Sequence, residues 1–323
     1  MQELEYELFK KTTTTVLKST EILQSMAKAI AYIDCLSSFA HTAGEKKYCR
    51  PVVAPDKVIL IKNGRHPVVE HVIGSDFVPN DTTMNQESRC MLLTGPNMAG
   101  KSTYIRQVSL IILLAHIGSY VPADSAIVPL TDRVFARIGA SDALHKGLST
   151  FMVEMTETAH ILQQVTDKSF VILDEVGRGT GTSDGLSIAQ AVAEHLAKIP
   201  EQPFVFFATH YHELADLSKQ ISVFRNYAMR VTVHKNTLIF LRKLEEGSTD
   251  ESFGVEVAKH AGLPLRVVSR AEYLKNHLND TARHQLNTTH FDQIIHDIQA
   301  LHLDEVSPKK AWEILDELQK KIT

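Results

Sequence analysis

The sequence predicts an α/β fold in which helices flank a mostly parallel sheet. Three observations lead to this fold class. Short apolar strands alternate with helical stretches after residue 50, a glycine-rich turn joins one of these strands to a helix, and an amphipathic heptad pattern precedes them both. At 323 residues the chain is long enough for more than one domain.

The composition is that of a globular protein, with 44% apolar and 22% charged residues and a formal net charge of −4. It is unlike a basic nucleic-acid module, although a local basic face stays compatible with this charge. The three cysteines have no paired spacing, which favours a reducing compartment, so we expect a cytoplasmic protein. We expect no membrane span, because the oiliest run, Leu110–Ala115, is far shorter than the roughly 20 residues that a bilayer requires.

Residues 1–45 are predicted to form a long helix, because apolar and small residues recur at heptad spacing from Leu8 to Ala40. The threonines Thr12–Thr15 favour a break, since β-branched side chains lose rotamer freedom in a helix. Gly44 is the expected stop. The pattern starts without a cap, which suggests the C-terminal part of a longer protein.

Residues 46–250 are predicted to form the α/β domain. The expected strands are Val58–Ile61, Cys90–Thr94, Phe170–Asp174 and Phe204–Thr209. The last three are almost entirely apolar, as in a parallel sheet that is covered on both faces. Val231–His234 and Thr237–Lys243 alternate more and are predicted to form an antiparallel hairpin near the sheet edge.

The remaining residues are predicted to form three segments. Residues 251–275 have two helical patterns broken at Gly262-Leu263-Pro264, which indicates a helix-turn-helix that packs on a partner subunit. Residues 276–290 are polar and indicate a linker. Residues 291–323 indicate a small helical module, too short to bury much surface alone, that promotes oligomers.

The turn Gly95-Pro96-Asn97-Met98-Ala99-Gly100-Lys101-Ser102 has the spacing G-x-x-x-x-G-K-[ST] between a predicted strand and a predicted helix. Its backbone N–H groups and the following helix N-terminus are suited to phosphate oxygens. We therefore expect the turn and the adjacent Thr103 to bind the nucleotide. Lys101 would reach the β- and γ-phosphates, and the Ser102 hydroxyl would bind Mg²⁺.

Two carboxylates end the strand Phe170–Asp174 and are expected at the same sheet edge as the turn. Such a pair alone is more often a solvated edge, but together with a phosphate-binding turn it completes a phosphoryl-transfer set. Asp174 would support Mg²⁺, and Glu175 would act as general base. His210, after the next strand, could sense the γ-phosphate; a metal site with His212 is disfavoured because no other ligands stand at suitable spacing.

Four stretches then carry a family resemblance, with support from IGSYVPA at Ile117 and FGVEVAKHAGLP at Phe253. They are TGPNMAGKSTYIRQ from Thr94, STFMVEMTET from Ser149, DEVGRGTGTSDG from Asp174 and ATHYHEL from Ala208. With them the sequence resembles the C-terminal ATPase and dimerisation region of the MutS family of DNA mismatch repair proteins, bacterial type. The resemblance implies an ABC-type P-loop ATPase.

The resemblance also implies residue roles. Ser149 would contact, in trans, the γ-phosphate held by the opposing subunit, which is compatible with a helix-capping role. Asn97 would add a γ-phosphate contact, and Phe77, followed by Val78, would stack on adenine. Two residues depart from bacterial relatives: Leu148 replaces a polar or basic residue before S-T-F, and Arg242 stands where some relatives place another residue against the adenine.

The function implied is Mg²⁺-dependent hydrolysis of ATP to ADP and phosphate at composite sites across a homodimer, weak in the isolated chain. The resemblance also implies coupling to mismatched double-stranded DNA and a MutL-type partner in the full-length protein, and tetramers if the tail adds a contact. The mismatch-reading domain is not in this chain. Two alternatives are a non-enzymatic nucleotide-binding interaction module and a transporter or chromosome-maintenance ATPase; the latter predicts an LSGGQ-like signature or a very long coiled coil, and neither is present.

Overall fold

The computed structural model describes residues 1–96, 99–139, 149–234, 237–248, 253–275 and 277. The chain divides into two compact units, Met1–Ser252 and Phe253–Thr323, and each is described by itself. Apart from residue 277, the predicted linker and tail over 276–323 lie outside the described residues. Within the part that is described, no helix is both long and apolar enough to cross a membrane.

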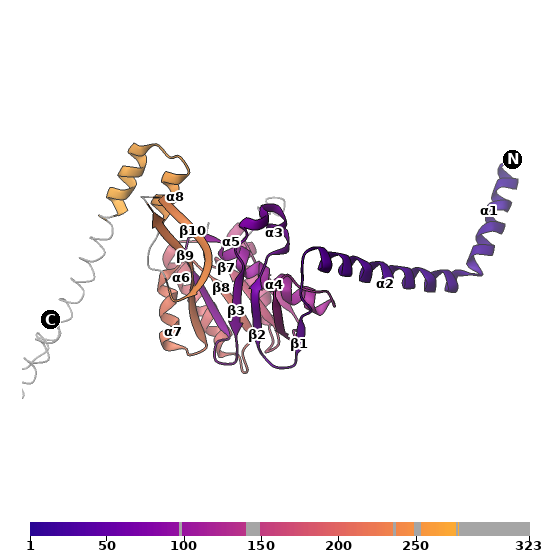
Figure 1. The fold of residues 1–323 in the computed structure, drawn as a ribbon, viewed down its shortest axis with the longest axis horizontal. Coiled ribbons are helices and arrows are strands. Elements are labelled where there is room, and N and C mark those ends of the chain that lie inside the picture. The colour runs from indigo at the N-terminus through magenta and orange to yellow at the C-terminus, as the bar shows by residue number, and fades with distance from the viewer. Residues whose placement is uncertain (97–98, 140–148, 235–236, 249–252, 276, 278–323) are drawn as a thin grey trace, which may run out of the picture. The chain divides into compact units, whose positions relative to one another are not determined.

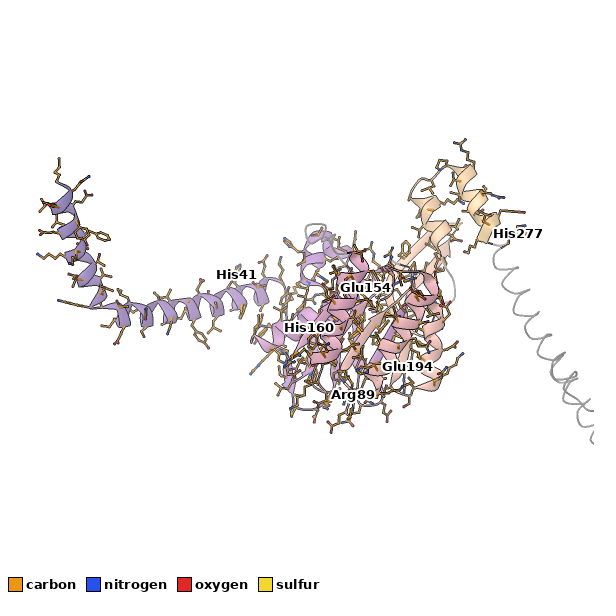
Figure 2. The ribbon with its side chains drawn as sticks, turned by 180° about the vertical axis from the view of Figure 1, so that it is seen from behind. His41, Arg89, Glu154, His160, Glu194 and His277 are labelled. Carbon is orange, nitrogen blue, oxygen red and sulfur yellow. The ribbon has the colours of Figure 1, made fainter. Side chains whose placement is uncertain are left out.

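Two helices open the chain, α1 (Gln2–Leu17) and α2 (Thr20–Glu45), and none of their residues is buried (Figures 1 and 2). The predicted break in the threonine run is wrong, because the helices part at Lys18 and Ser19. The four threonine hydroxyls donate to the carbonyls four residues earlier, at 2.7 to 2.9 Å, which keeps these side chains satisfied within α1. The predicted stop at Gly44 is wrong by a residue, since α2 continues to Glu45.

A six-stranded sheet forms the centre of the first unit, in the order β10-β9-β4-β8-β7-β6 (Figure 1). Every neighbouring pair is parallel except β9 and β10, so the prediction of a mostly parallel sheet is confirmed. The six strands are β4 (Cys90–Thr94), β6 (Val134–Arg137), β7 (Phe170–Asp174), β8 (Phe204–Ala208), β9 (Phe224–His234) and β10 (Thr237–Glu246).

Helices cover both faces of this sheet, as the apolar strands predict. In β7, Phe170 and Ile172 join the same core as helix α4 (Lys101–His116). Val171 and Leu173 face the other way, into the core shared with α6 (Thr182–Lys198). Strands β4, β7 and β8 are buried along their whole length, which holds their carboxyl ends in fixed positions.

A second sheet of four strands lies in the same unit, in the order β1-β5-β2-β3. Only β1 and β5 are parallel in it. Its strands are β1 (Val52–Ala54), β2 (Ile59–Gly64), β3 (Asn80–Met84) and β5 (Ser125–Pro129). The sequence predicted β2 alone, one residue early; between β2 and β3 lie α3 (Pro67–Ile73) and a 3₁₀ turn (Gly74–Asp76).

The predicted antiparallel hairpin is confirmed as β9 and β10, with β10 at the sheet edge. It is longer than predicted, because β9 starts at Phe224 and also pairs in parallel with β4. The register shifts between Phe240 and Leu244, and Arg242 within this bulge has φ of 55°. Bulges of this kind redirect a side chain from the sheet.

Helical segments complete the two units. The first also contains α5 (Thr150–Gln164), the 3₁₀ turn His212–Asp216 and α7 (Leu217–Gln220). The second contains α8 (Gly254–His260) and a helix over residues 265–275, separated by a turn in which Gly262 has φ of 86°. These two helices match the two predicted patterns and the predicted break.

Candidate active site

The candidate site starts at the turn between β4 and α4. Gly95 and Gly100 have φ of 118° and 104°, a region that glycine alone adopts readily. Helix α4 begins at Lys101, directly after the turn, and the backbone N–H groups at its N-terminus favour an anion. Asn97 and Met98, also predicted to contact nucleotide, lie outside the described residues.

Lys101 lies inside this turn. It is only 2% exposed, and its Nζ donates a hydrogen bond to the carbonyl of Gly95. Burial lowers the pKa of Lys101, against the opposing pull of the carboxylates Glu175 and Asp174. A buried cation surrounded by backbone is suited to receive phosphate oxygens, because they restore the charge neutralisation that water no longer provides.

Ser102 and Asp174 meet at the next position of the site. The Ser102 hydroxyl donates to Asp174 Oδ2 at 2.7 Å and so connects α4 to the end of β7. The other carboxylate oxygen, Oδ1, is buried and has no hydrogen-bond partner among the residues that the structure describes, and burial raises the pKa of Asp174. A hydroxyl and a carboxylate with unused lone pairs are ligands that Mg²⁺ prefers, so these two residues fit the predicted cation.

Glu175 follows directly, in a left-handed backbone conformation with φ of 58°. Its N–H donates to the carbonyl of Ala208 at 2.9 Å, which fixes the turn against the end of β8. Its side chain is 18% exposed and forms an ion pair with Arg178. A non-glycine residue adopts this conformation at a cost of about 1–2 kcal/mol, so the surrounding contacts hold it there.

His210 lies after β8, and its ring packs against that of Tyr211 with centroids 4.1 Å apart. Burial lowers the pKa of His210, while the charge of Glu175 acts in the opposite direction. The imidazole is therefore biased toward its neutral form close to Glu175. The structure thus brings together Glu175, predicted to be the general base, and Lys101 and His210, both predicted to act at the γ-phosphate during catalysis.

Ser149 is the N-cap residue of α5. Its hydroxyl accepts a hydrogen bond from the Met152 N–H at 3.2 Å, and the residue is exposed. The capping role considered from the sequence is thereby confirmed. Leu148 lies outside the described residues.

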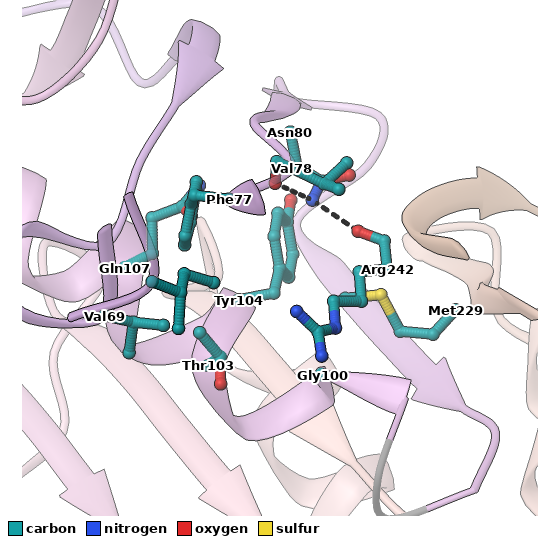
Figure 3. A pocket seen from close by; sticks show the side chains of 11 residues that line it. Val69, Phe77, Val78, Asn80, Gly100, Thr103, Tyr104, Gln107, Met229 and Arg242 are labelled. Atoms are coloured by element: carbon teal, nitrogen blue, oxygen red, sulfur yellow. Dashed lines mark hydrogen bonds between the residues drawn. The ribbon is translucent and has the colours of Figure 1, made fainter. Parts of the chain in front are cut away.

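A pocket of about 260 Å³ adjoins the turn on its α4 side (Figure 3). Phe77 and Val78, which precede β3, line it together with Thr103, and the Arg242 side chain approaches from the opposite side. The sequence missed Tyr104 and Gln107, which also line it. Gln107 follows Thr103 by four residues and Tyr104 by three on α4, and this spacing was the available signal, since residues so spaced share one side of a helix.

A second cavity, of about 300 Å³, lies beside the two strand-end acids. It is lined by Arg137, Gly139, Thr150, Glu154, Asp174, Glu175, Arg178 and Gly179. Arg137 and Glu154 were not predicted from the sequence, and both are only 4% exposed. Charged residues this well buried are uncommon unless they are paired, as these two are.

Comparisons with known proteins show which family this chain resembles. A family model described as MutS domain V matches residues 91–279. The chain is 46% identical over 99% of its length to the DNA mismatch repair protein MutS of Caldicellulosiruptor saccharolyticus, and 44% identical over 99% to that of Desulfitobacterium hafniense, covering 40% and 39% of those proteins. The MutS of Clostridium novyi is 50% identical over 87% of the chain, which covers 31% of it. The chain therefore spans well under half the length of these relatives.

Proposed function

The chain belongs to the MutS family of DNA mismatch repair proteins, and from this we propose that it binds ATP and hydrolyses it to ADP and phosphate with Mg²⁺. The observation that carries the proposal is the 2.7 Å hydrogen bond between Ser102 and Asp174. It joins the phosphate-binding turn to the strand-end acids, and Lys101 and Glu175 flank it on either side. This set of side chains is what phosphoryl transfer requires.

ATP binding is proposed to use both the turn and the pocket beside it. The backbone N–H groups of the turn and Lys101 would hold the phosphates. The base would enter the pocket between Phe77 and Arg242, where an aromatic ring and a guanidinium can both stack on a purine. The volume of about 260 Å³ suits a flat heterocycle.

For hydrolysis, Ser102 and Asp174 would hold Mg²⁺, which neutralises charge on the β- and γ-phosphates when bound. Glu175 would accept a proton from the water that attacks the γ-phosphorus, while the bond to the bridging oxygen of ADP breaks. Arg178 must first release the Glu175 carboxylate, because the ion pair occupies the oxygens that would accept the proton. The neutral imidazole of His210 would orient the water or the γ-phosphate by a hydrogen bond.

The sites are proposed to be composite, so that Ser149 of one chain completes the site of its twin in a homodimer. The exposure of Ser149 at a helix N-terminus supports this role. By family membership we further propose that ATP turnover is coupled to mismatched DNA and to a MutL-type partner in the longer protein, in the cytoplasm. Residues 291–323 would add a tetramer contact.

A mixing experiment tests the composite site. Lys101→Ala should weaken ATP binding by roughly 100-fold, since charged hydrogen bonds contribute about 1.5–3 kcal/mol each, and Ser149→Ala should turn over slowly. An equimolar mixture of the two variants should recover about one quarter of wild-type turnover, because about half of the dimers are mixed and each of those has one intact site of two. No recovery in proven mixed dimers contradicts the contact in trans.

Turnover against protein concentration tests the ATPase itself. Turnover per chain should rise with concentration as dimers form. Stoichiometric nucleotide binding without phosphate release, at concentrations where light scattering shows dimers and with mismatched DNA present, would instead identify a non-enzymatic nucleotide-binding module.

A further inference from the structure

The backbone N–H and carbonyl of Gly177, two residues after Glu175, are each held by a side chain of another element. Its N–H donates to Glu154 Oε1 of α5 at 2.5 Å. The hydroxyl of Tyr211, just beyond β8, donates to the Gly177 carbonyl at 3.0 Å. Side chains from two elements far apart in the sequence therefore fix the two peptide groups on either side of the Gly177 Cα, in the loop that carries Glu175.

The packing around this peptide leaves little freedom. Gly177 has φ of 89°, and a Cβ atom there would overlap the backbone of Gly185 at the start of α6. A Cβ atom on Gly185 would in turn overlap the Tyr211 hydroxyl. Both positions therefore require glycine, and the contact among the three residues is close enough to transmit small displacements.

Glu154 is itself held in place. It is 4% exposed, and its Oε2 lies 3.4 Å from Arg137 Nη2 at the end of β6. Arg137, also 4% exposed, is 3.3 Å from the more exposed Glu157 on the same helix. Replacing a buried ion pair by apolar residues is often neutral or stabilising, so stability alone does not account for this pair.

We propose that Glu154 and Tyr211 are positioning residues for hydrolysis. Their hydrogen bonds act as a clamp on the backbone of Gly177 and so fix the orientation of the Glu175 side chain. The inference rests on the proposed ATPase function. Because Tyr211 directly follows His210 and their rings are in contact, the same clamp also sets the position of His210. Glu154 belongs to α5, the helix that Ser149 caps. A shift of α5 would therefore displace the general base Glu175 of the same chain through the Glu154 carboxylate.

The first test separates turnover from binding. Tyr211→Phe removes only the hydroxyl and should lower kcat about fivefold, the value of one hydrogen bond. Glu154→Ala should lower kcat roughly 10- to 100-fold, because small misplacements of a catalytic group have effects of this size. KM and the affinity for a non-hydrolysable ATP analogue should stay within about twofold in both variants.

Two further variants distinguish the clamp from the ion pair. Glu154→Gln keeps an oxygen for the Gly177 N–H but loses the charge beside Arg137, so its kcat should fall less than that of Glu154→Ala. The matched control is Glu157→Gln, which removes the other carboxylate of Arg137 without touching Gly177 and should leave kcat unchanged. Equal losses in Glu154→Gln and Glu154→Ala, or lower thermal stability with wild-type turnover per bound nucleotide, would overturn the proposal.

Hydrogen exchange gives a readout that needs no turnover. Backbone amides in a peptide covering residues 174–180 should exchange at least tenfold faster in Glu154→Ala than in wild type, and at the wild-type rate in Glu157→Gln. Unchanged exchange in Glu154→Ala contradicts the clamp. If wild type binds ATP but never releases phosphate, the ATPase proposal fails, and the exchange result still decides whether Glu154 holds Gly177.

Discussion

The two cavities beside the glycine-rich turn differ in chemistry. The pocket of Phe77 and Arg242 is walled mainly by apolar side chains, and surface burial would dominate binding there. The cavity of Glu154 and Glu175 is walled by carboxylates and guanidinium groups, whose value depends on where they point. The proposed function thus places nucleotide affinity on the apolar side of the site and chemistry on the charged side, and substitutions on the two sides should alter different kinetic constants.

The largest effect expected is on the charged side. Glu175→Gln removes the general base but keeps the shape of the side chain, so kcat should fall by about 10²–10⁴-fold. ATP affinity should change little. Single-turnover phosphate release and equilibrium binding of a fluorescent nucleotide measure the two quantities, and Glu194→Gln, which alters a surface ion pair on α6, is the control. A loss of ATP affinity as large as the loss of kcat would contradict the assignment of binding and catalysis to different sides of the site.

An intermediate effect is expected in the apolar pocket. Phe77→Ala should weaken nucleotide binding about tenfold, the scale of base–aromatic stacking, while kcat at saturating ATP stays near wild type. Calorimetric titration with ATP analogues measures the affinity. Phe9→Ala removes the same ring from an exposed position on α1 and should change nothing. Equal affinity in Phe77→Ala and wild type would place the base elsewhere.

The smallest effect concerns Asp174, which lines the charged cavity. Because burial raises the pKa of Asp174 from its ordinary value of 3.8, the folded state binds a proton that the unfolded state has released. The stability contributed by this group is therefore present at low pH and lost as the pH rises through the raised pKa.

Asp174→Asn should relieve this burial cost. Without metal at pH 7 its midpoint of thermal unfolding should lie a few degrees above that of wild type, since about 1 kcal/mol moves the midpoint by ~2–4 °C in a unit of this size. The difference should shrink toward pH 4, and Mg²⁺ with ATP should stabilise wild type much more than the variant. A variant less stable than wild type at pH 7 would contradict the assignment; calorimetry at several pH values measures this.

The six-stranded sheet was predictable where its strands are continuous apolar runs, as in β4, β7 and β8. The four-stranded sheet was largely missed, because β3 reads Asn-Asp-Thr-Thr-Met and has the composition of a loop. It is a strand because tertiary contacts override propensity: Thr82 is 1% exposed and shares a hydrogen bond of 2.9 Å with the buried Tyr104. The break between α1 and α2 was misplaced for a different, local reason: hydrogen bonds within α1 satisfy the hydroxyls of the threonines.

At the site, residues within one contiguous motif were predictable because the motif itself specifies their spacing and their chemistry. Glu154 and Tyr211 were not, since each acts on a single backbone group of another element. A glutamate in a helix and a tyrosine after a strand carry no sign of such a partner in the sequence. Their role becomes visible only once β7, β8 and α5 lie side by side.

Asn80 connects the two sheets of the first unit. Its side-chain amide donates to the carbonyl of Arg242 at 2.9 Å, and its oxygen accepts from the N–H of Leu244 at 2.8 Å. It lies on β3, whereas both partners lie on β10. The pocket proposed for the base is lined by residues of both sheets, so a bound purine would link the two sheets reversibly. We expect the hairpin of β9 and β10 to be more rigid with ATP bound than after the nucleotide has left.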